Sequence, residues 1–123
     1  MSLKIAVPTD DGETISRHFG QAIQFRVLTL ENNQVIHSEL RLKASHRHGD
    51  HTQTPGVHPG QQMVEAISDC QVLICGGMGT PAYNRAQNAG LQVILTSQTS
   101  IQAALQAFAA GNLAHEGQLI HSH

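Results

Sequence analysis

The stretch Gln71-Val72-Leu73-Ile74-Cys75-Gly76-Gly77-Met78-Gly79-Thr80 joins an apolar run to a glycine-rich turn, and Thr80-Pro81 begins the next helical pattern. The apolar run is typical of a buried strand, and proline suits the first turn of a helix because its φ is already helical. A strand that reaches a tight turn before a helix is where α/β proteins bind ligands. We therefore expect this turn to form one wall of a binding site.

Outward from this stretch, the hydrophobic pattern predicts three strands followed by alternating helices and strands. Apolar or alternating runs predict strands at residues 3–8, 24–30, 35–42, 72–75 and 91–95. Helical spacing predicts helices at residues 61–69, 81–90 and 101–111. Asn32 and Asn33 predict a hairpin turn, because asparagine tolerates positive φ. On the third strand, strict alternation would put Val35 on the same face as His37.

This order of elements predicts an α/β fold in one domain that covers residues 1–123. Three hairpin-linked strands and two strand–helix units suit a mixed five-stranded sheet flanked by helices. Right-handed crossovers place the fourth strand beside the first, which predicts the order 3-2-1-4-5 with strand 2 antiparallel. The carboxyl ends of strands 1 and 4 then meet, so the loop at residues 8–20 should contact residues 75–79. Residues 114–123 are expected to form a weakly structured tail.

The composition is that of a globular protein and argues against several classes of function. Hydrophobic residues make up 40% of the chain and aromatic residues 3%, so we expect an aliphatic core without a stacking surface for single-stranded nucleic acid. A net charge of −2 provides no electrostatic attraction for nucleic acid or for an anionic membrane. No apolar run approaches about 20 residues and no signal peptide leads the chain, which predicts a cytoplasmic protein without a membrane segment.

Nine histidines in 123 residues, against seven lysines and arginines, are typical of contact with transition metals. Four of them lie in a long loop over residues 43–60 that has no apolar period: His46, His48, His51 and His58. Their spacing can chelate a divalent transition metal, although the loop lacks the Cys-x-x-Cys pair of a structural zinc site. The same pattern also fits a mobile polar loop that binds metal weakly.

A further candidate histidine lies in the loop that should approach the glycine-rich turn. His18 follows Arg17 in a glycine-flanked segment, and neutral imidazole is a good ligand for iron, nickel, copper or zinc. Its second ring nitrogen would need an orienting partner. Arg17 could offset the negative charge of a bound cluster. From the residues alone, a loop histidine bonded to backbone is an equal interpretation.

The turn itself offers sulfur and backbone ligands. Cys75 could ligate metal as a thiolate, with its pKa lowered by nearby helix N–H groups, or it could be a buried core thiol. The N–H groups of Gly76, Gly77 and Gly79 could receive an anionic cluster, or these glycines could only form a tight turn. Met78 could face a soft metal or pack in the core.

Four motifs resemble one known family. They are Ile5-Ala6-Val7-Pro8-Thr9-Asp10, Ser16-x-His18-Phe19-Gly20, Cys75-Gly76-Gly77-Met78-Gly79 and Ala104-x-x-x-Phe108-x-x-Gly111-Asn112-Leu113. In this order they are similar to the dinitrogenase iron–molybdenum cofactor biosynthesis family (the NifX-like or NifB C-terminal-like domain), over nearly the whole chain. The resemblance implies a ribonuclease H-like fold. It also implies a non-catalytic role in which His18 ligates an iron–sulfur or iron–molybdenum-type cofactor or its precursor. The His-rich loop is longer than the family's pattern implies.

The sequence therefore favours a carrier protein that is not an enzyme. It would bind its cofactor transiently, with cofactor-assembly proteins as donor or acceptor, and would be a monomer or a weak homodimer. The alternative is a protein that binds or senses a transition metal through the His46–His58 loop. A small hydrolase or nuclease is a third interpretation. It would need carboxylates around Mg²⁺, and the fourth predicted strand ends in Cys-Gly-Gly without an acid.

Overall fold

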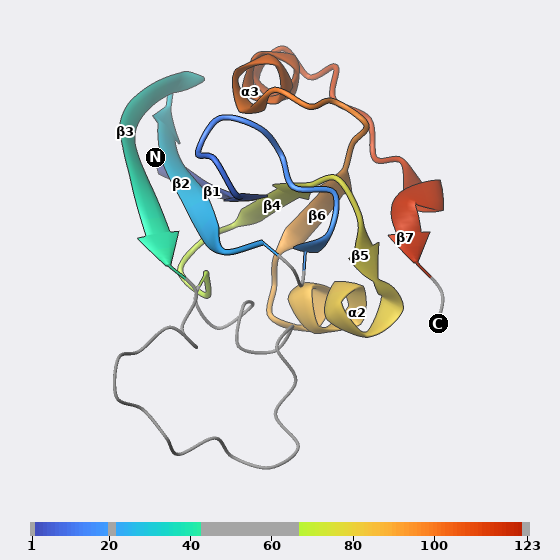
Figure 1. Cartoon of the computed structure of the whole chain (residues 1–123). Coiled ribbons are helices and arrows are strands. Elements are labelled where there is room, and N and C mark those ends of the chain that lie inside the picture. The colour runs from blue at the N-terminus through green and yellow to red at the C-terminus, as the bar shows by residue number, and fades with distance from the viewer. Residues whose placement is uncertain (1, 20–21, 43–66, 122–123) are drawn as a thin grey trace, which may run out of the picture.

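The chain folds around a mixed five-stranded sheet that lies between helices (Figure 1). The computed structural model describes residues 2–19, 22–42 and 67–121. The strands are β1 (Ser2–Thr9), β2 (Gln24–Glu31), β3 (Gln34–Leu42), β4 (Val72–Cys75), β5 (Met78–Gly79), β6 (Gln92–Leu95) and β7 (Ile120–His121). The helices are α2 (Thr80–Asn88), α3 (Ile101–Ala109) and the short 3₁₀ helix η3 (Gly117–Leu119). Within the described residues, every helix is too short or too polar to span a membrane.

The order across the sheet is β3-β2-β1-β4-β6. β2 runs antiparallel to β1 and β3, whereas β4 runs parallel to β1 and β6. The predicted mixed five-stranded α/β sheet is therefore confirmed. The strand predicted as the fifth is β6, because Met78–Gly79 forms an additional short strand, β5, that pairs with β7 apart from the main sheet.

Each face of the sheet covers its own hydrophobic core, because successive side chains of a strand point to opposite faces. The core on the α2 side includes Ala6, Phe19, Phe25, Val27, Leu73 and Ala86. The core on the α3 side includes Ile5, Val7, Leu28, Ile74, Ile101 and Leu105. β4 is buried along its whole length since it lies inside the sheet with a core on either side.

Local sequence signals set the turn and the helix ends, as predicted. Asn32 and Asn33 have φ values of 55° and 64° and form the turn between β2 and β3. Ser100 caps α3, because its Oγ accepts a backbone N–H from the first turn at 3.2 Å. Gly90 and Gly111 follow α2 and α3 with φ values of 92° and 77°, a conformation that disfavours other residues.

One prediction about β3 is wrong. The register between β2 and β3 shifts at Thr29 and Leu30, so that Thr29 lies opposite His37 while Leu30 lies opposite Val35. This bulge turns Val35 toward the α3 side of the sheet, where it lines a groove with Leu105. Val35 therefore does not share a face with His37. Strict alternation cannot predict an inserted residue, because the bulge is a property of the pair of strands.

An ion pair joins the end of β3 to the start of β4. Arg41 contacts Asp69 through Nη1–Oδ1 at 2.7 Å and Nη2–Oδ2 at 3.3 Å, and Lys4 Nζ lies 3.1 Å from Asp69 Oδ2. The hydrogen bonds from Arg41 hold the pKa of Asp69 well below its usual range. Between these partners lie the predicted loop over 43–60 and most of the predicted helix over 61–69. Both fall outside the described residues, as do His46, His48, His51 and His58.

We expect Asp69→Asn to lower the free energy of unfolding by about 1 kcal/mol at neutral pH, because the exposed ion pairs to Arg41 and Lys4 are lost. Folding lowers the pKa of this carboxyl. The stabilisation is therefore complete above the ordinary value of 3.8 and declines as the pH falls below it. Urea denaturation of both proteins at neutral pH and near about pH 3 measures the change.

Glu31→Gln is the matched control, since Glu31 is an exposed carboxyl in the hairpin. We expect it to leave the free energy of unfolding nearly unchanged. A difference between wild type and Asp69→Asn that is equal at the two pH values would contradict the assignment of the ion pair.

Candidate functional site

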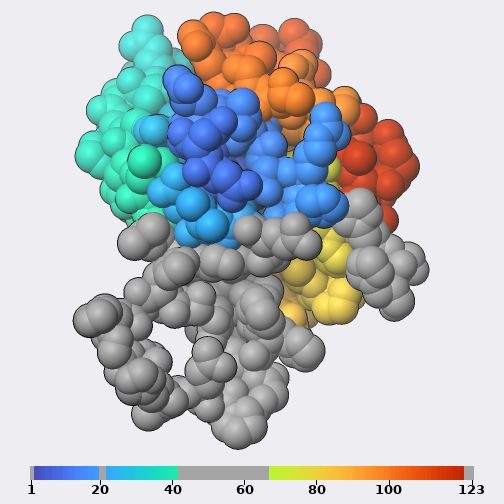
Figure 2. Space-filling model, in the orientation of Figure 1, coloured from blue at the N-terminus to red at the C-terminus, as the bar shows by residue number. Residues whose placement is uncertain are grey.

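Two segments that are distant in sequence approach each other at the carboxyl ends of β1 and β4. These strands are parallel neighbours, with Ala6 beside Leu73. After β1 the chain loops outward and returns as β2 on one side, whereas after β4 it turns at Gly76 toward α2 on the other side. Figure 2 shows the loop after β1, in blue, on the molecular surface between α3 and α2. In open α/β sheets, ligands bind where neighbouring connections diverge in this way.

The loop after β1 and the turn after β4 are joined by two backbone hydrogen bonds. The N–H of Gly76 donates to the carbonyl of Ser16 at 2.9 Å, and the N–H of Phe19 donates to the carbonyl of Gly77 at 3.0 Å. The predicted contact between these segments is therefore confirmed. Because each segment supplies one donor and one acceptor, the two backbones hold each other at two points and fix the residues between them.

The first half of the loop is held by the Asp11 carboxylate. Its Oδ1 accepts the backbone N–H groups of Glu13 and Thr14, each at 2.8 Å, and the Thr14 hydroxyl donates to Oδ2 at 2.9 Å. These bonds to the charged form lower the pKa of Asp11 to about 2. Further along, the N–H of Ile15 donates to the carbonyl of Thr99 at 2.8 Å. The loop is thus bonded to the segment before α3 as well as to the turn.

His18 is exposed on this fixed loop. The Ser16 hydroxyl donates to the carbonyl of His18 at 3.1 Å and accepts its backbone N–H at 3.2 Å. The next residue, Phe19, is only 1% exposed and its ring lies 5.8 Å from that of Phe25. The backbone on both sides of His18 is held near the carboxyl ends of β1 and β4. The positions that its imidazole can reach are therefore restricted. Arg17 beside it is also exposed.

Gly76 is required by the closeness of the loop. A Cβ at this position would lie 2.8 Å from the carbonyl oxygen of Ser16 and 3.0 Å from Cα of Arg17. Both neighbours are backbone atoms, so a side chain there would push the loop away from the turn. This glycine therefore serves the approach of two chain segments, in agreement with the expectation that the backbone comes close at this turn.

The expectation that the pKa of Cys75 is lowered is wrong. The thiol has no solvent exposure and lies 3.9 Å from the sulfur of Met78, which is 2% exposed. Burial raises the pKa of Cys75 to about 12, although a hydrogen bond from the Gly77 backbone opposes the rise. At neutral pH the group is a protonated core thiol. In the described structure, Cys75 and Met78 are packing residues under the turn.

The N–H of Gly76 is engaged, since it donates to the Ser16 carbonyl at 2.9 Å. It can receive an anionic cluster only by giving up this bond. Gly79 is half-buried and precedes the first turn of α2. What faces outward at this edge is the loop, with His18 and Arg17.

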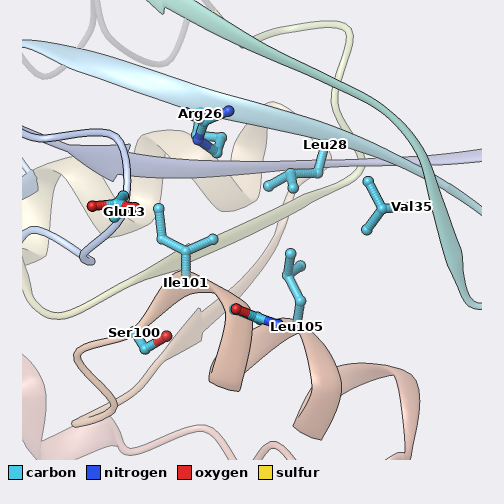
Figure 3. Close-up of a pocket in the computed structure, with 8 residues that line it drawn as sticks. Glu13, Arg26, Leu28, Val35, Ser100, Ile101 and Leu105 are labelled. Carbon is cyan, nitrogen blue, oxygen red and sulfur yellow. The ribbon is translucent and has the colours of Figure 1, made fainter.

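Two further observations bear on where a metal ion or a ligand could bind. Residues 2–19, 22–42 and 67–121 contain no group of three or more His, Cys, Asp or Glu side chains that could hold a metal ion. A groove of about 340 Å³ lies between α3 and the β2–β3 hairpin (Figure 3). Its lining includes Arg26, Leu28, Val35 and Leu105 but neither His18 nor a cysteine. This groove is therefore not the site predicted from the sequence.

Sequence reasoning missed the residues that hold the site in place. Ser16 stands two residues before His18, a spacing typical of a hydroxyl that bonds the backbone nearby, and this signal could have identified it. His115 lies in the predicted tail, and there its Nδ1 accepts the N–H of Leu95 at 3.2 Å and its ring stacks on Tyr83. No short-range pattern indicates that contact, because it joins residues 20 positions apart.

The sequence matches the family described as "Dinitrogenase iron-molybdenum cofactor" over residues 1–111. The chain belongs to this family.

Three proteins of similar sequence or fold each cover most of the chain. The uncharacterized protein MJ0580 of Methanocaldococcus jannaschii is 28% identical over 111 residues, which are 90% of this chain and 89% of that protein. The crystal structure of PH0822 superposes with a TM-score of 0.72 at 22% identity, covering 93% of this chain and 95% of that one. The apo form of the orange protein from Desulfovibrio gigas has a TM-score of 0.72 at 21% identity, with 92% of each chain covered. At these identities the two structures establish a shared fold.

We expect Gly76→Ala to lower the free energy of unfolding by about 2 kcal/mol, because the new methyl group overlaps the Ser16 carbonyl. Urea denaturation measures this change, and proteolysis within residues 12–19 should become faster in the variant. Gly117→Ala is the matched control, since the nearest atom to its added Cβ is Nε2 of His115 at 3.9 Å. Equal stability of the two variants would contradict the close approach.

We expect neither cysteine to react quickly with a thiol reagent in the folded protein. Burial raises the pKa of Cys70 to about 11 and that of Cys75 to about 12, so that little thiolate is present at neutral pH. Absorbance after addition of Ellman's reagent should rise slowly in buffer and quickly in urea. A thiol that reacts in buffer as fast as free cysteine would mean that one of these sulfurs is open to solvent.

Proposed function

We propose that this family member is a non-catalytic carrier that binds an iron–sulfur-type cofactor, or the precursor of an iron–molybdenum cofactor, through His18. The observation that carries the proposal is the exposed imidazole on a loop that two backbone hydrogen bonds hold against the turn after β4. Family membership supports the choice of cargo. We further propose that the protein acts in the cytoplasm and exchanges its cargo with cofactor-assembly proteins.

The chemistry of a single imidazole suits a preassembled cluster. A bare transition-metal ion needs three or four protein ligands for tight binding, whereas a cluster brings its own sulfide ligands and can be held by fewer protein groups. An imidazole nitrogen is a good donor to iron. His18 would therefore supply one directional bond to one metal of the cluster.

The charges around His18 agree with an anionic cargo. Arg17 is exposed next to it, and a guanidinium keeps its charge at any physiological pH. The thiol of Cys75 is buried and protonated, so it adds neither a negative charge nor a second strong ligand at the surface. With one imidazole bond and one nearby positive charge, binding is weak enough for the cargo to be passed on. Release is what a carrier needs.

The test is uptake of iron–molybdenum cofactor extracted from dinitrogenase, under anaerobic conditions, followed by desalting and analysis of iron and molybdenum. We expect wild type to retain the cofactor and His18→Ala to bind it at least about tenfold more weakly, because the metal–imidazole bond is lost. His37→Ala is the matched control. His37 is an exposed histidine on β3 and should be dispensable.

Equal uptake by wild type and His18→Ala would overturn the ligand assignment. A variant with His46, His48 and His51 all changed to alanine separates the carrier from a protein that binds metal through the histidine-rich segment. Loss of binding in that variant with full binding in His18→Ala, measured with the cofactor and with Ni²⁺ alone, would favour the metal binder. A cluster assembled from Fe²⁺ and sulfide tests whether molybdenum is needed.

A further inference from the structure

The two edges of the main sheet differ in how they are protected. At the β6 edge, the chain after α3 covers Leu95, whose N–H donates to Nδ1 of His115 at 3.2 Å and whose carbonyl accepts the N–H of Glu116 at 2.8 Å. At the other edge, within the described residues, no strand pairs with the outer side of β3. Figure 1 shows β3 as the outermost strand on that side. An edge strand presents unpaired N–H and carbonyl groups that can bind another strand.

Of the devices that keep edge strands apart, β3 has the bulge near Val35. It spans nine residues and contains neither proline nor lysine. Three of its apolar side chains are exposed: Val35 by 48%, Ile36 by 57% and Leu40 by 49%. Figure 3 shows Val35 beside the groove that also contains Leu28 and Leu105, so the exposed apolar surface continues onto the sheet and α3. Apolar residues grouped on one unpaired strand indicate a surface that is covered by a partner.

We propose that a second copy of this chain covers this edge, by antiparallel pairing of β3 with β3 about a two-fold axis at Ser38. In this register His37 of each copy lies opposite Glu39 of the other, in the regular part of β3 beyond the bulge. An imidazole and a carboxylate are complementary partners for a hydrogen bond across the two strands. The same strand supplies both halves of each pair, which makes the surface complementary to itself.

Hydrogen-bonding partners favour this register over its neighbours. An axis at Glu39 would place two Glu39 carboxylates opposite each other, and like charges directly opposite on paired strands are destabilising. An axis at His37 would place the two imidazoles opposite each other, without a carboxylate across the axis. The two side chains needed for the Ser38 register are accessible. His37 is 61% exposed and Glu39 is 41% exposed, although they contact each other at 3.3 Å within one copy.

The experiment uses two charge variants of the full chain, His37→Glu and Glu39→Lys. In the Ser38 register, His37→Glu alone places two carboxylates opposite each other twice, and Glu39→Lys alone removes both carboxylates that the imidazoles face. In a mixture of the two, an introduced carboxylate faces an introduced ammonium at one place, and the native imidazole and carboxylate remain paired at the other. We expect sedimentation equilibrium to show that wild type dimerises reversibly with concentration and that each variant raises the dimer Kd about tenfold or more. We expect the mixture to form heterodimers with a Kd near that of wild type.

Gln92→Glu is the matched control, because it adds a negative charge to the exposed start of the opposite edge strand β6. It should dimerise like wild type. A wild type that stays monomeric at every concentration would overturn the proposal, as would a mixture that associates no better than its components. Dimerisation weakened equally by Gln92→Glu and His37→Glu would also overturn it, since the charge would then act regardless of edge.

A covalent test does not depend on the stability of the charge variants. Across the axis, Ser38 lies directly opposite its own copy, with Cα atoms about 5 Å apart, so Ser38→Cys should form a disulfide-linked dimer under mild oxidation. The native thiols of Cys70 and Cys75 are buried and should not interfere. Gln34→Cys, on the same strand but about 27 Å from its own copy, should stay unlinked. Linkage of both variants at equal rates, or of neither, would overturn the register.

Discussion

The site depends on the close contact between two backbones, at Ser16–Phe19 and at Gly76–Gly77. Two neutral hydrogen bonds contribute only about 1 kcal/mol each, so their importance lies in position more than in energy. Burial of the Phe19 ring contributes more, about 2 to 3 kcal/mol, and keeps the loop on the sheet. Between these held points His18 faces solvent, on a loop that stays attached at the carboxyl ends of β1 and β4. An imidazole on an unattached loop would lose conformational entropy when it binds a metal. The loop of His18 has already lost this entropy on folding.

The same contact divides the roles of the two segments. The turn after β4 presents backbone groups of Gly76 and Gly77 to the loop and its sulfur atoms to the core, so it supports the loop. Cys75 illustrates the reason: a thiolate there would have to exist without solvent, and burial raises the pKa instead. The loop faces outward with an imidazole and a guanidinium. A site of this kind suits cargo that arrives assembled and leaves again.

The sheet edges show a second asymmetry. The chain after α3 crosses β6, where His115 and Glu116 bond Leu95, and then pairs as β7 with β5. This brings the end of the described chain beside the turn that supports His18. β3, at the opposite edge, exposes apolar side chains between charged ones. The edge near the site is thus closed within the chain, while the far edge is suited to a second copy.

The sequence by itself determined the five strands of the main sheet, the asparagine turn, the positions of α2 and α3, and the meeting of the loop with the glycine-rich turn. These follow from short-range periodicity, φ preferences and the handedness of crossovers, which act over a few residues or on whole elements. Only the tertiary structure decided which side of a segment is open. Whether Cys75 is buried, whether Gly76 gives its N–H to Ser16, and where a bulge turns Val35 all depend on atoms contributed by distant segments. Burial and hydrogen-bond partners are properties of the packed chain, and no local pattern carries them.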